Sequence, residues 1–310
     1  MLICKVLGCK ISMHSQIMRS ERRQNYERYK IPSCHPFVKW AGGKSQLLPQ
    51  IMHYLPQKFT RYFEPFLGGG AVFFHIAPYS RNAILSDINA DLINVYKIIK
   101  NNVEELIMAL NYHQAEYNKS PKRYYYELRN SKKVFNNIEK AARFITLNKT
   151  CYNGLYRVNK NGLFNVPIGR YKNPLICDIN NLRKASIVLK HSRSSLRVGD
   201  YKKILEEKAD MDDFIYLDPP FHPVSNTANF TSYTNNGFML EDQQDLAVMF
   251  KKLTQRGCKL LLSNSNTEEI RRLYSDYSHF TEITSANRSI NTIGSKRTGH
   301  EELLIRNYPQ

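Results

Sequence analysis

The stretch Phe214-Ile215-Tyr216-Leu217-Asp218-Pro219-Pro220-Phe221 places a carboxylate at the end of a short apolar, β-prone run. Residues 214–217 are typical of a buried strand. The two prolines carry no backbone N–H and have a fixed φ, so the chain beyond the strand is stiff, and Pro219 restricts Asp218 to an extended conformation. The pattern predicts two fixed acceptors, Asp218 and a nearby carbonyl, beside the aromatic face of Phe221. They suit a flat ring that carries an amino group, although an ordinary Asp-Pro turn at a strand end would have the same sequence.

A glycine turn and an acid follow two other predicted strands. The run Arg61-Tyr-Phe-Glu-Pro-Phe-Leu-Gly-Gly-Gly70 predicts a strand, a glycine turn and then an apolar helix, and a second strand at 83–85 leads to Asp87. Rossmann-like sheets bind nucleotides with glycines after the first strand and an acid after the second, which takes the ribose hydroxyls. The glycine spacing does not match Gly-x-Gly-x-x-Gly, and NAD is therefore disfavoured.

A second glycine pair precedes a predicted helix that contains Leu47, Leu48 and Ile51. Gly42-Gly43-Lys44-Ser45 resembles the end of a Walker A loop, but Val38 stands where that loop needs its first glycine, so we reject a P-loop. The pair instead predicts bare N–H groups facing a ligand, with Lys44 beside them.

The remaining pattern indicates an α/β fold. Strands are predicted at 195–198, 259–263, 279–284 and 302–306, with helices at 246–253 and 267–274 among them. Strands separated by helices predict a mostly parallel sheet with helices on both faces. We expect a flexible basic lead at 1–34, a catalytic domain at 35–100 and 191–310, and an insertion at 101–190. The insertion has helical stretches at 103–112, 124–129 and 139–147 and a β-hairpin signal at Asn161-Gly162.

The net charge of +18 over 310 residues indicates a polyanionic partner. Residues 111–190 hold 16 Lys and Arg against 4 Asp and Glu, together with eight of the 20 tyrosines. Basic charge interleaved with aromatic rings favours nucleic acid, because the charge neutralises phosphates and the rings stack on bases. The predicted hairpin carries Arg157, Lys160, Arg170 and Tyr171, and a two-stranded ribbon fits the DNA major groove.

The sequence argues against a membrane-spanning protein and against a protein stabilised by zinc or disulfides. No apolar run approaches about 18 residues, so a membrane-spanning helix is not expected. The six cysteines are scattered without a Cys-x-x-Cys pair, which argues against a structural zinc or a disulfide framework and is typical of cytosolic thiols. We therefore expect no metal.

Together these motifs resemble the Dam-type (D12 class) N6-adenine DNA methyltransferases, including the GATC modification methylases of restriction-modification systems. The matching segments run from about residue 36 to 308, nearly the whole chain after the lead. They are Phe37–Lys44, Phe63–Gly70, Asp87 with Asn89, Tyr152–Arg157, Phe164–Pro167, Tyr171, Asp218–Phe221, Ala228–Tyr233 and Glu302–Ile305. The resemblance implies a Rossmann-like S-adenosylmethionine-dependent methyltransferase sheet with an inserted, mostly helical DNA-recognition domain that carries the hairpin.

The resemblance also implies roles for individual residues. The positions that match the S-adenosylmethionine site are Trp40, Lys44, Asp87 and Asp218, with the 66–70 loop (Phe66, Gly68, Gly70) lining the methionine end. The positions that match GATC readers are Lys39, Leu155, Arg157 and Pro167, with Tyr171 flanking the target and Tyr152 and Asn153 near the gap left by the extruded base. The family usually ends its catalytic motif in Tyr, whereas this chain has Phe221, which keeps stacking but loses a phenolic hydrogen bond.

The expected reaction is methyl transfer to the N6 amine of a flipped adenine of GATC, with Asp218 and the Pro219 carbonyl accepting the amine hydrogens. The expected partners are double-stranded DNA, single-stranded DNA as a further option, and a cognate restriction endonuclease, in the cytoplasm of a bacterium. An N4-cytosine DNA methyltransferase and a non-catalytic DNA-binding protein with the same fold are alternatives. An Asp rather than a Ser before Pro219-Pro220 favours adenine.

Overall fold

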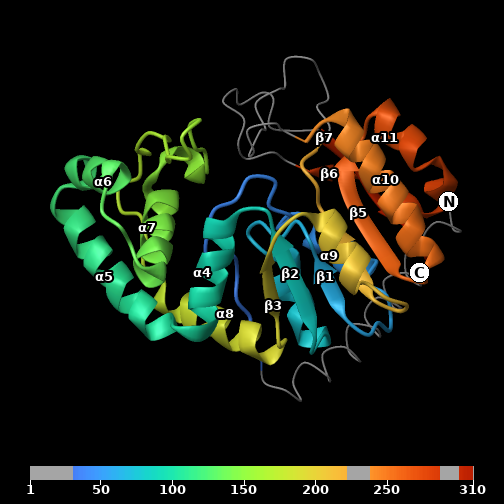
Figure 1. The fold of residues 1–310 in the computed structure, drawn as a ribbon, viewed down its shortest axis with the longest axis horizontal. Coiled ribbons are helices and arrows are strands. Elements are labelled where there is room, and N and C mark those ends of the chain that lie inside the picture. The colour runs from blue at the N-terminus through green and yellow to red at the C-terminus, as the bar shows by residue number, and fades with distance from the viewer. Residues whose placement is uncertain (1–30, 222–237, 287–299, 310) are drawn as a thin grey trace, which may run out of the picture.

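The computed structural model describes residues 31–221, 238–286 and 300–309, and within them seven strands form one sheet. The sheet has the order β3-β2-β1-β4-β5-β7-β6 (Figure 1). The strands are β1 (Tyr62–Glu64), β2 (Ala83–Asp87), β3 (Ser195–Val198), β4 (Phe214–Leu217), β5 (Lys259–Ser265), β6 (Thr281–Ala286) and β7 (His300–Arg306). The first five strands pair in parallel, and β7 lies antiparallel to both β5 and β6. The predicted mostly parallel sheet is confirmed.

Helices cover both faces of this sheet, and the alternation of side chains along β4 shows why. Phe214 and Tyr216 belong to one hydrophobic core, whereas Ile215 and Leu217 belong to a second. Successive side chains of a strand point to opposite faces, so a strand that is apolar throughout needs a cover on each side. The first core is covered by α2 (Leu48–His53), α3 (Ala71–Ile76), α4 (Ala90–Asn101) and α8 (Ile179–His191). The second is covered by α9 (Tyr201–Lys208), α10 (Leu240–Gln255) and α11 (Glu268–Leu273).

Three helices of the predicted insertion form a group at one end of the molecule (Figure 1). They are α5 (Val103–Lys119), α6 (Pro121–Asn130) and α7 (Asn137–Thr150). Their buried side chains, Leu110, Tyr125 and Ile145 among them, belong to the same core cluster as the first face of the sheet. These three helices therefore pack on the rest of the protein through a continuous apolar core, with α4 and α8 between them and the sheet.

The structure differs from the sequence-based expectations in several places. Helices α8 and α9 were not predicted, and strand β6 begins only at Thr281, because residues 275–280 form a 3₁₀-helix. The predicted hairpin is a pair of antiparallel segments joined by isolated bridges, Val158 to Phe164 and Cys151 to Ile168, rather than two regular strands. Ile31 and Cys34, which we had assigned to the lead, are buried in the core. The motif at 228–233 lies outside the described residues.

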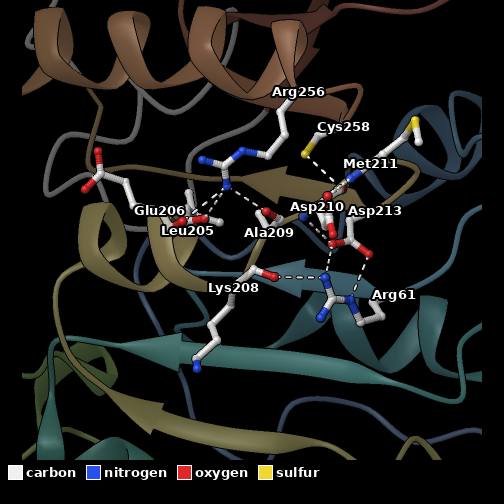
Figure 2. Close-up of polar contacts among 10 residues, drawn as sticks. All are labelled: Arg61, Leu205, Glu206, Lys208, Ala209, Asp210, Met211, Asp213, Arg256 and Cys258. Carbon is white, nitrogen blue, oxygen red and sulfur yellow. Dashed lines mark hydrogen bonds and ion pairs between the residues drawn. The ribbon is translucent and has the colours of Figure 1, made fainter.

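The amino-terminal edge of the sheet is held by an ion pair (Figure 2). Arg61, just before β1, donates from Nε and Nη2 to the two carboxylate oxygens of Asp213, just before β4, at 2.9 and 2.6 Å. Asp213 is fully buried, and a planar bidentate pair of this kind fixes geometry as well as charge. Arg256 closes the same edge by donating to the carbonyl of Ala209 at 2.6 Å. The predicted site residues lie at the opposite, carboxyl edge of the sheet. None of the described helices has the length and apolarity needed to cross a membrane.

Candidate active site

The predicted site residues meet at the carboxyl edge of the sheet, because β1, β2 and β4 run parallel and end there. The glycine turn follows β1, Asp87 ends β2, and Asp218 follows β4. Ligands of open α/β sheets bind outside this edge. Segments far apart in the sequence are therefore brought to one place by the sheet topology.

Asp87 joins the glycine turn to β2 and to the start of α4. Its two carboxylate oxygens accept the backbone N–H groups of Gly68 at 3.0 Å and of Asn89 at 2.9 Å. Burial raises the pKa of Asp87 and these backbone donors oppose the rise. Each carboxylate oxygen can accept more than one hydrogen bond, so the group can still receive the two hydroxyls of a ribose.

The turn requires glycine at two positions with left-handed φ, Gly68 at +48° and Gly70 at +70°. A Cβ on Gly68 would lie 2.7 Å from Cδ1 of Trp40, and a Cβ on Gly70 would lie 2.5 Å from Oη of Tyr96. Tyr96 also donates from its hydroxyl to the Gly68 carbonyl at 3.0 Å. The glycines therefore serve close packing of Trp40 and Tyr96 against the turn. Phe66 lies apart from these contacts, with its ring against Tyr201.

Lys44 and Asp218, which the sequence analysis assigned to two different motifs, form a partly buried ion pair. Lys44 Nζ lies 2.8 Å from Asp218 Oδ1, with side chains 6% and 19% exposed. The same ammonium donates to the Gly42 carbonyl at 2.7 Å and lies 4.5 Å from the ring centroid of Phe221. Burial raises the pKa of Asp218, and Lys44 opposes the rise. Lys44 thus favours the carboxylate form of Asp218, which lies between the glycine pair and the aromatic face.

Replacing Lys44 with methionine should shift the acid limb of the kcat–pH profile to higher pH by at least about one unit, because an opposite charge at this distance lowers a carboxyl pKa by about 1–3 units. In the expected reaction the ionised Asp218 is the active form, so activity should be lost as pH falls through the Asp218 pKa, and removing Lys44 should raise that pKa further. The measurement is kcat against pH at saturating methyl donor, for the wild-type protein and the variant. An unchanged acid limb would show that Lys44 does not set the ionisation of Asp218.

Two residues that the sequence analysis missed hold the proline pair in place. Gln243 of α10, fully buried, donates to the Pro220 carbonyl at 2.9 Å, and Asn264 of β5 donates to the Gln243 carbonyl oxygen at 2.9 Å. A buried amide with both ends paired orients its neighbour strongly. The available signal was a polar Gln243 at helical spacing from the apolar Leu246 and Phe250.

Glu64, at the end of β1, was also not singled out. It is buried, and Tyr62 donates from its hydroxyl to Glu64 Oε2 at 2.7 Å. Burial raises the pKa of Glu64 to about 8, with the Asp218 charge adding to the rise. Glu64 is therefore mostly protonated at neutral pH, so it adds little negative charge near Asp218.

The residues that match DNA readers gather around a tight turn after α7, the 3₁₀-helix Tyr152–Gly154. Tyr152 is 40% exposed, and its N–H donates to the Pro167 carbonyl at 2.9 Å. Lys39 Nζ lies 3.7 Å from the ring centroid of Tyr171. Asn153 adopts a left-handed φ of 53° at the exposed tip of this turn, and Leu155 follows it. Arg157 lies further along the predicted hairpin, exposed, where its Nε donates to Asn165 Oδ1 at 2.7 Å.

Comparison with known proteins adds a family to this geometry. The family model of the D12 class N6 adenine-specific DNA methyltransferases matches residues 40–288. The chain is 45% identical over 290 residues to the type II methyltransferase M.MjaIII of Methanocaldococcus jannaschii, covering 88% of this chain and 99% of that protein. It is 42% identical over 282 residues to the type II methyltransferase M1.LlaDCHI of Lactococcus lactis subsp. cremoris, with coverages of 89% and 96%. It is 37% identical over 268 residues to the DNA adenine methylase of Escherichia coli strain K12, with coverages of 86% and 93%.

Proposed function

Because the chain belongs to the D12 class of N6-adenine-specific DNA methyltransferases, we propose that its target is the adenine of GATC in duplex DNA. The family assignment makes the chain an S-adenosylmethionine-dependent enzyme that methylates adenine in DNA. It leaves no support for the N4-cytosine and non-catalytic alternatives. The observation that carries the proposed chemistry is the Lys44–Asp218 pair beside Phe221, at the edge where the glycine turn and Asp87 also lie.

The donor set at this edge suits S-adenosylmethionine. We assign the ribose hydroxyls to Asp87, the charged methionine end to Lys44 and the turn at 66–70, and the adenine-side packing to Trp40. When bound, this cofactor supplies an electrophilic methyl group on a sulfonium. The acids, the ammonium and the aromatic rings described above are what this chain contributes to hold and orient it.

The amine at N6 of adenine is a poor nucleophile because its lone pair is delocalised into the ring, and it cannot be reached in a stacked duplex. In the proposed mechanism the flipped base stacks on Phe221, and its two N6 hydrogens are accepted by Asp218 and the Pro219 carbonyl. These acceptors draw the nitrogen toward tetrahedral geometry and stabilise the positive charge that grows on it. Alignment of the amine with the methyl group would let the N–C bond form as the C–S bond breaks, with the electron pair left on sulfur and one N6 proton released, so no covalent enzyme intermediate is needed.

Site reading is assigned to the surface around the Tyr152–Gly154 turn. Lys39, Leu155, Arg157 and Pro167 contact the bases of GATC, Tyr171 lies at the flank, and Tyr152 and Asn153 lie near the gap left by the flipped adenine. Support comes from the resemblance of these motifs to those of the GATC modification methylases, and from the contacts of Lys39 with Tyr171 and of Tyr152 with Pro167 on a partly exposed surface.

Replacing Arg157 with alanine should reduce discrimination against a changed guanine about 10- to 100-fold, because a bidentate contact to guanine is worth about 1–3 kcal/mol. The Asn165 bond fixes the guanidinium plane, which prepares it for such a contact. The measurement is kcat/KM on GATC duplexes and on duplexes with one base pair changed. Arg170→Ala on the same segment is the control and should weaken binding of all duplexes equally, with a smaller salt dependence. An equal loss on every duplex for Arg157→Ala would make it a phosphate contact.

The proposed target is tested directly on plasmid DNA. The purified protein is incubated with plasmid and labelled S-adenosylmethionine, and the product is digested with nucleases that distinguish methylated from unmethylated GATC. Nucleoside analysis then identifies the modified base. Protection confined to GATC supports the proposal, whereas N6-methyladenine in another sequence would overturn the site but not the chemistry.

Two relatives carry the name type II methyltransferase, which supports a cognate restriction endonuclease as a partner. We propose that methylation by this chain protects cytoplasmic DNA from such an enzyme. The test is survival of a host that expresses a GATC endonuclease with and without this chain.

A further inference from the structure

One buried side chain joins the cofactor-binding segment to the proposed recognition turn. Asn148, on the last turn of α7, is 2% exposed. Its Oδ1 accepts the backbone N–H of Lys39 at 2.8 Å. Its Nδ2 donates to the Lys39 carbonyl at 2.8 Å and to the Gly154 carbonyl at 2.9 Å. One amide thus pairs with both backbone groups of Lys39 and with the turn that carries Tyr152 and Asn153.

Gly154 also packs tightly against the side chain of Lys39. Gly154 has a φ of +65°, and a Cβ on it would lie 2.4 Å from Cβ of Lys39. Lys39 is followed by Trp40, which packs against the glycine turn and stacks on Phe144 and Tyr156. Stacked rings tolerate sliding, whereas three paired hydrogen bonds fix both direction and distance. The hydrogen bonds of Asn148 therefore set the register between the two segments.

We propose that Asn148 is a positioning residue that fixes the recognition turn against the cofactor-binding segment. The residues that read the DNA sequence are thereby held at a constant position relative to the residues that bind the flipped base and the cofactor. The inference rests on the proposed function, in which Lys39 and the turn after α7 contact the DNA. A displacement of about 1 Å in a group that positions a substrate can cost about 100-fold in rate. Asn148 touches neither DNA nor cofactor in this account and acts through Lys39 and Gly154.

The chain contains a matched control for this residue. Asn181 of α8 is also buried, and its side chain makes the same pair of bonds with the backbone of His35, at 3.0 and 2.9 Å. It ties a helix to the segment just before the cofactor motif but has no bond to the recognition turn. Replacing either asparagine with aspartate keeps the volume and the acceptor for the N–H while removing the donors. Replacing either asparagine should lower the stability of the protein. Only the replacement of Asn148 should shift the recognition turn relative to the cofactor-binding segment.

The experiment compares Asn148→Asp and Asn148→Ala with Asn181→Asp and Asn181→Ala in the full-length chain. The readouts are Tm, the Kd for S-adenosylhomocysteine, and the ratio of kcat/KM between the preferred duplex and one with a single base pair changed. We expect the Asn148 variants to lower this discrimination at least tenfold with the Kd within about twofold of wild type. The Asn181 variants should lower Tm with discrimination unchanged. Unchanged discrimination in folded Asn148 variants, or an equal loss in the Asn181 variants, overturns the proposal.

A second pair of variants tests the same contact without altering Asn148, in case its variants do not fold. Gly154→Ala inserts a methyl group against Lys39, whereas Gly162→Ala, at a φ of +73°, has the same backbone strain with nothing within 4 Å. We expect only Gly154→Ala to lower discrimination, and equal effects of the two overturn the proposal. The preferred sequence is first determined on the wild-type protein. A preference other than GATC would overturn the proposed target alone, whereas the absence of any preference would overturn both.

Discussion

Asp218→Asn should lower kcat about 1000-fold at saturating methyl donor, while the protein stays folded. The variant keeps the shape of the side chain but loses the negative charge that stabilises the positive charge growing on N6. Removing one preorganised electrostatic group from an active site typically costs about 100- to 1000-fold in kcat. Asp218→Ala, which removes both acceptor atoms, should abolish measurable transfer. The measurement is single-turnover methylation of duplex DNA with saturating labelled donor.

Asp213→Asn provides the control, because it removes a buried carboxylate from the other end of the same strand. Asp213 is paired with Arg61 at 2.6 Å (Figure 2). It precedes β4, whereas Asp218 follows the same strand at its carboxyl end. Breaking a buried ion pair by removing one partner is strongly destabilising, so Tm should fall while kcat per folded molecule is kept. If Asp218→Asn turned over at a rate near wild type, the acceptor mechanism would be wrong.

Phe221→Ala should lower kcat/KM about 10- to 100-fold, because stacking of a base on an aromatic side chain is worth about 1–3 kcal/mol. The ring packs against the Lys44 ammonium at 4.5 Å, so its loss also exposes the Lys44–Asp218 pair to water. Phe221→Tyr keeps the ring and restores the residue usual in the family, and it should stay within a few-fold of wild type. The measurement is kcat/KM for duplex DNA, with donor Kd recorded for each variant.

The relative activities of the wild-type, Phe221→Ala and Phe221→Tyr proteins test the role of stacking. Equal activities of the wild-type, alanine and tyrosine proteins would remove stacking from the mechanism. A tyrosine variant much faster than wild type would instead show that the missing phenolic hydroxyl limits this enzyme, and that the departure from the family pattern lowers its rate.

Much of the fold followed from local patterns, because strand periodicity and strand endings are written in consecutive residues. The run Phe214–Leu217 is fully buried in β4, as its apolar sequence predicts, and the hairpin signal at Asn161-Gly162 coincides with a turn that has Gly162 at a φ of +73°. Local sequence patterns predicted less well those helices that are stabilised mainly by packing against other helices. Helix α8, with Lys and Arg on one face, forms because its other face packs against α4 and α5.

The sequence by itself determined the chemistry at each strand end: an acid held by two prolines, a glycine turn, and an acid after β2. Only the tertiary structure decided which of these groups meet. Lys44 pairs with Asp218 across two motifs, Gln243 and Asn264 hold Pro220, and Asn148 binds Lys39 from 109 residues away. The reason is physical, since a residue's type and spacing fix its local conformation and hydrogen-bonding capacity, but its partner is fixed by the order and direction of strands and by the packing of helices on them.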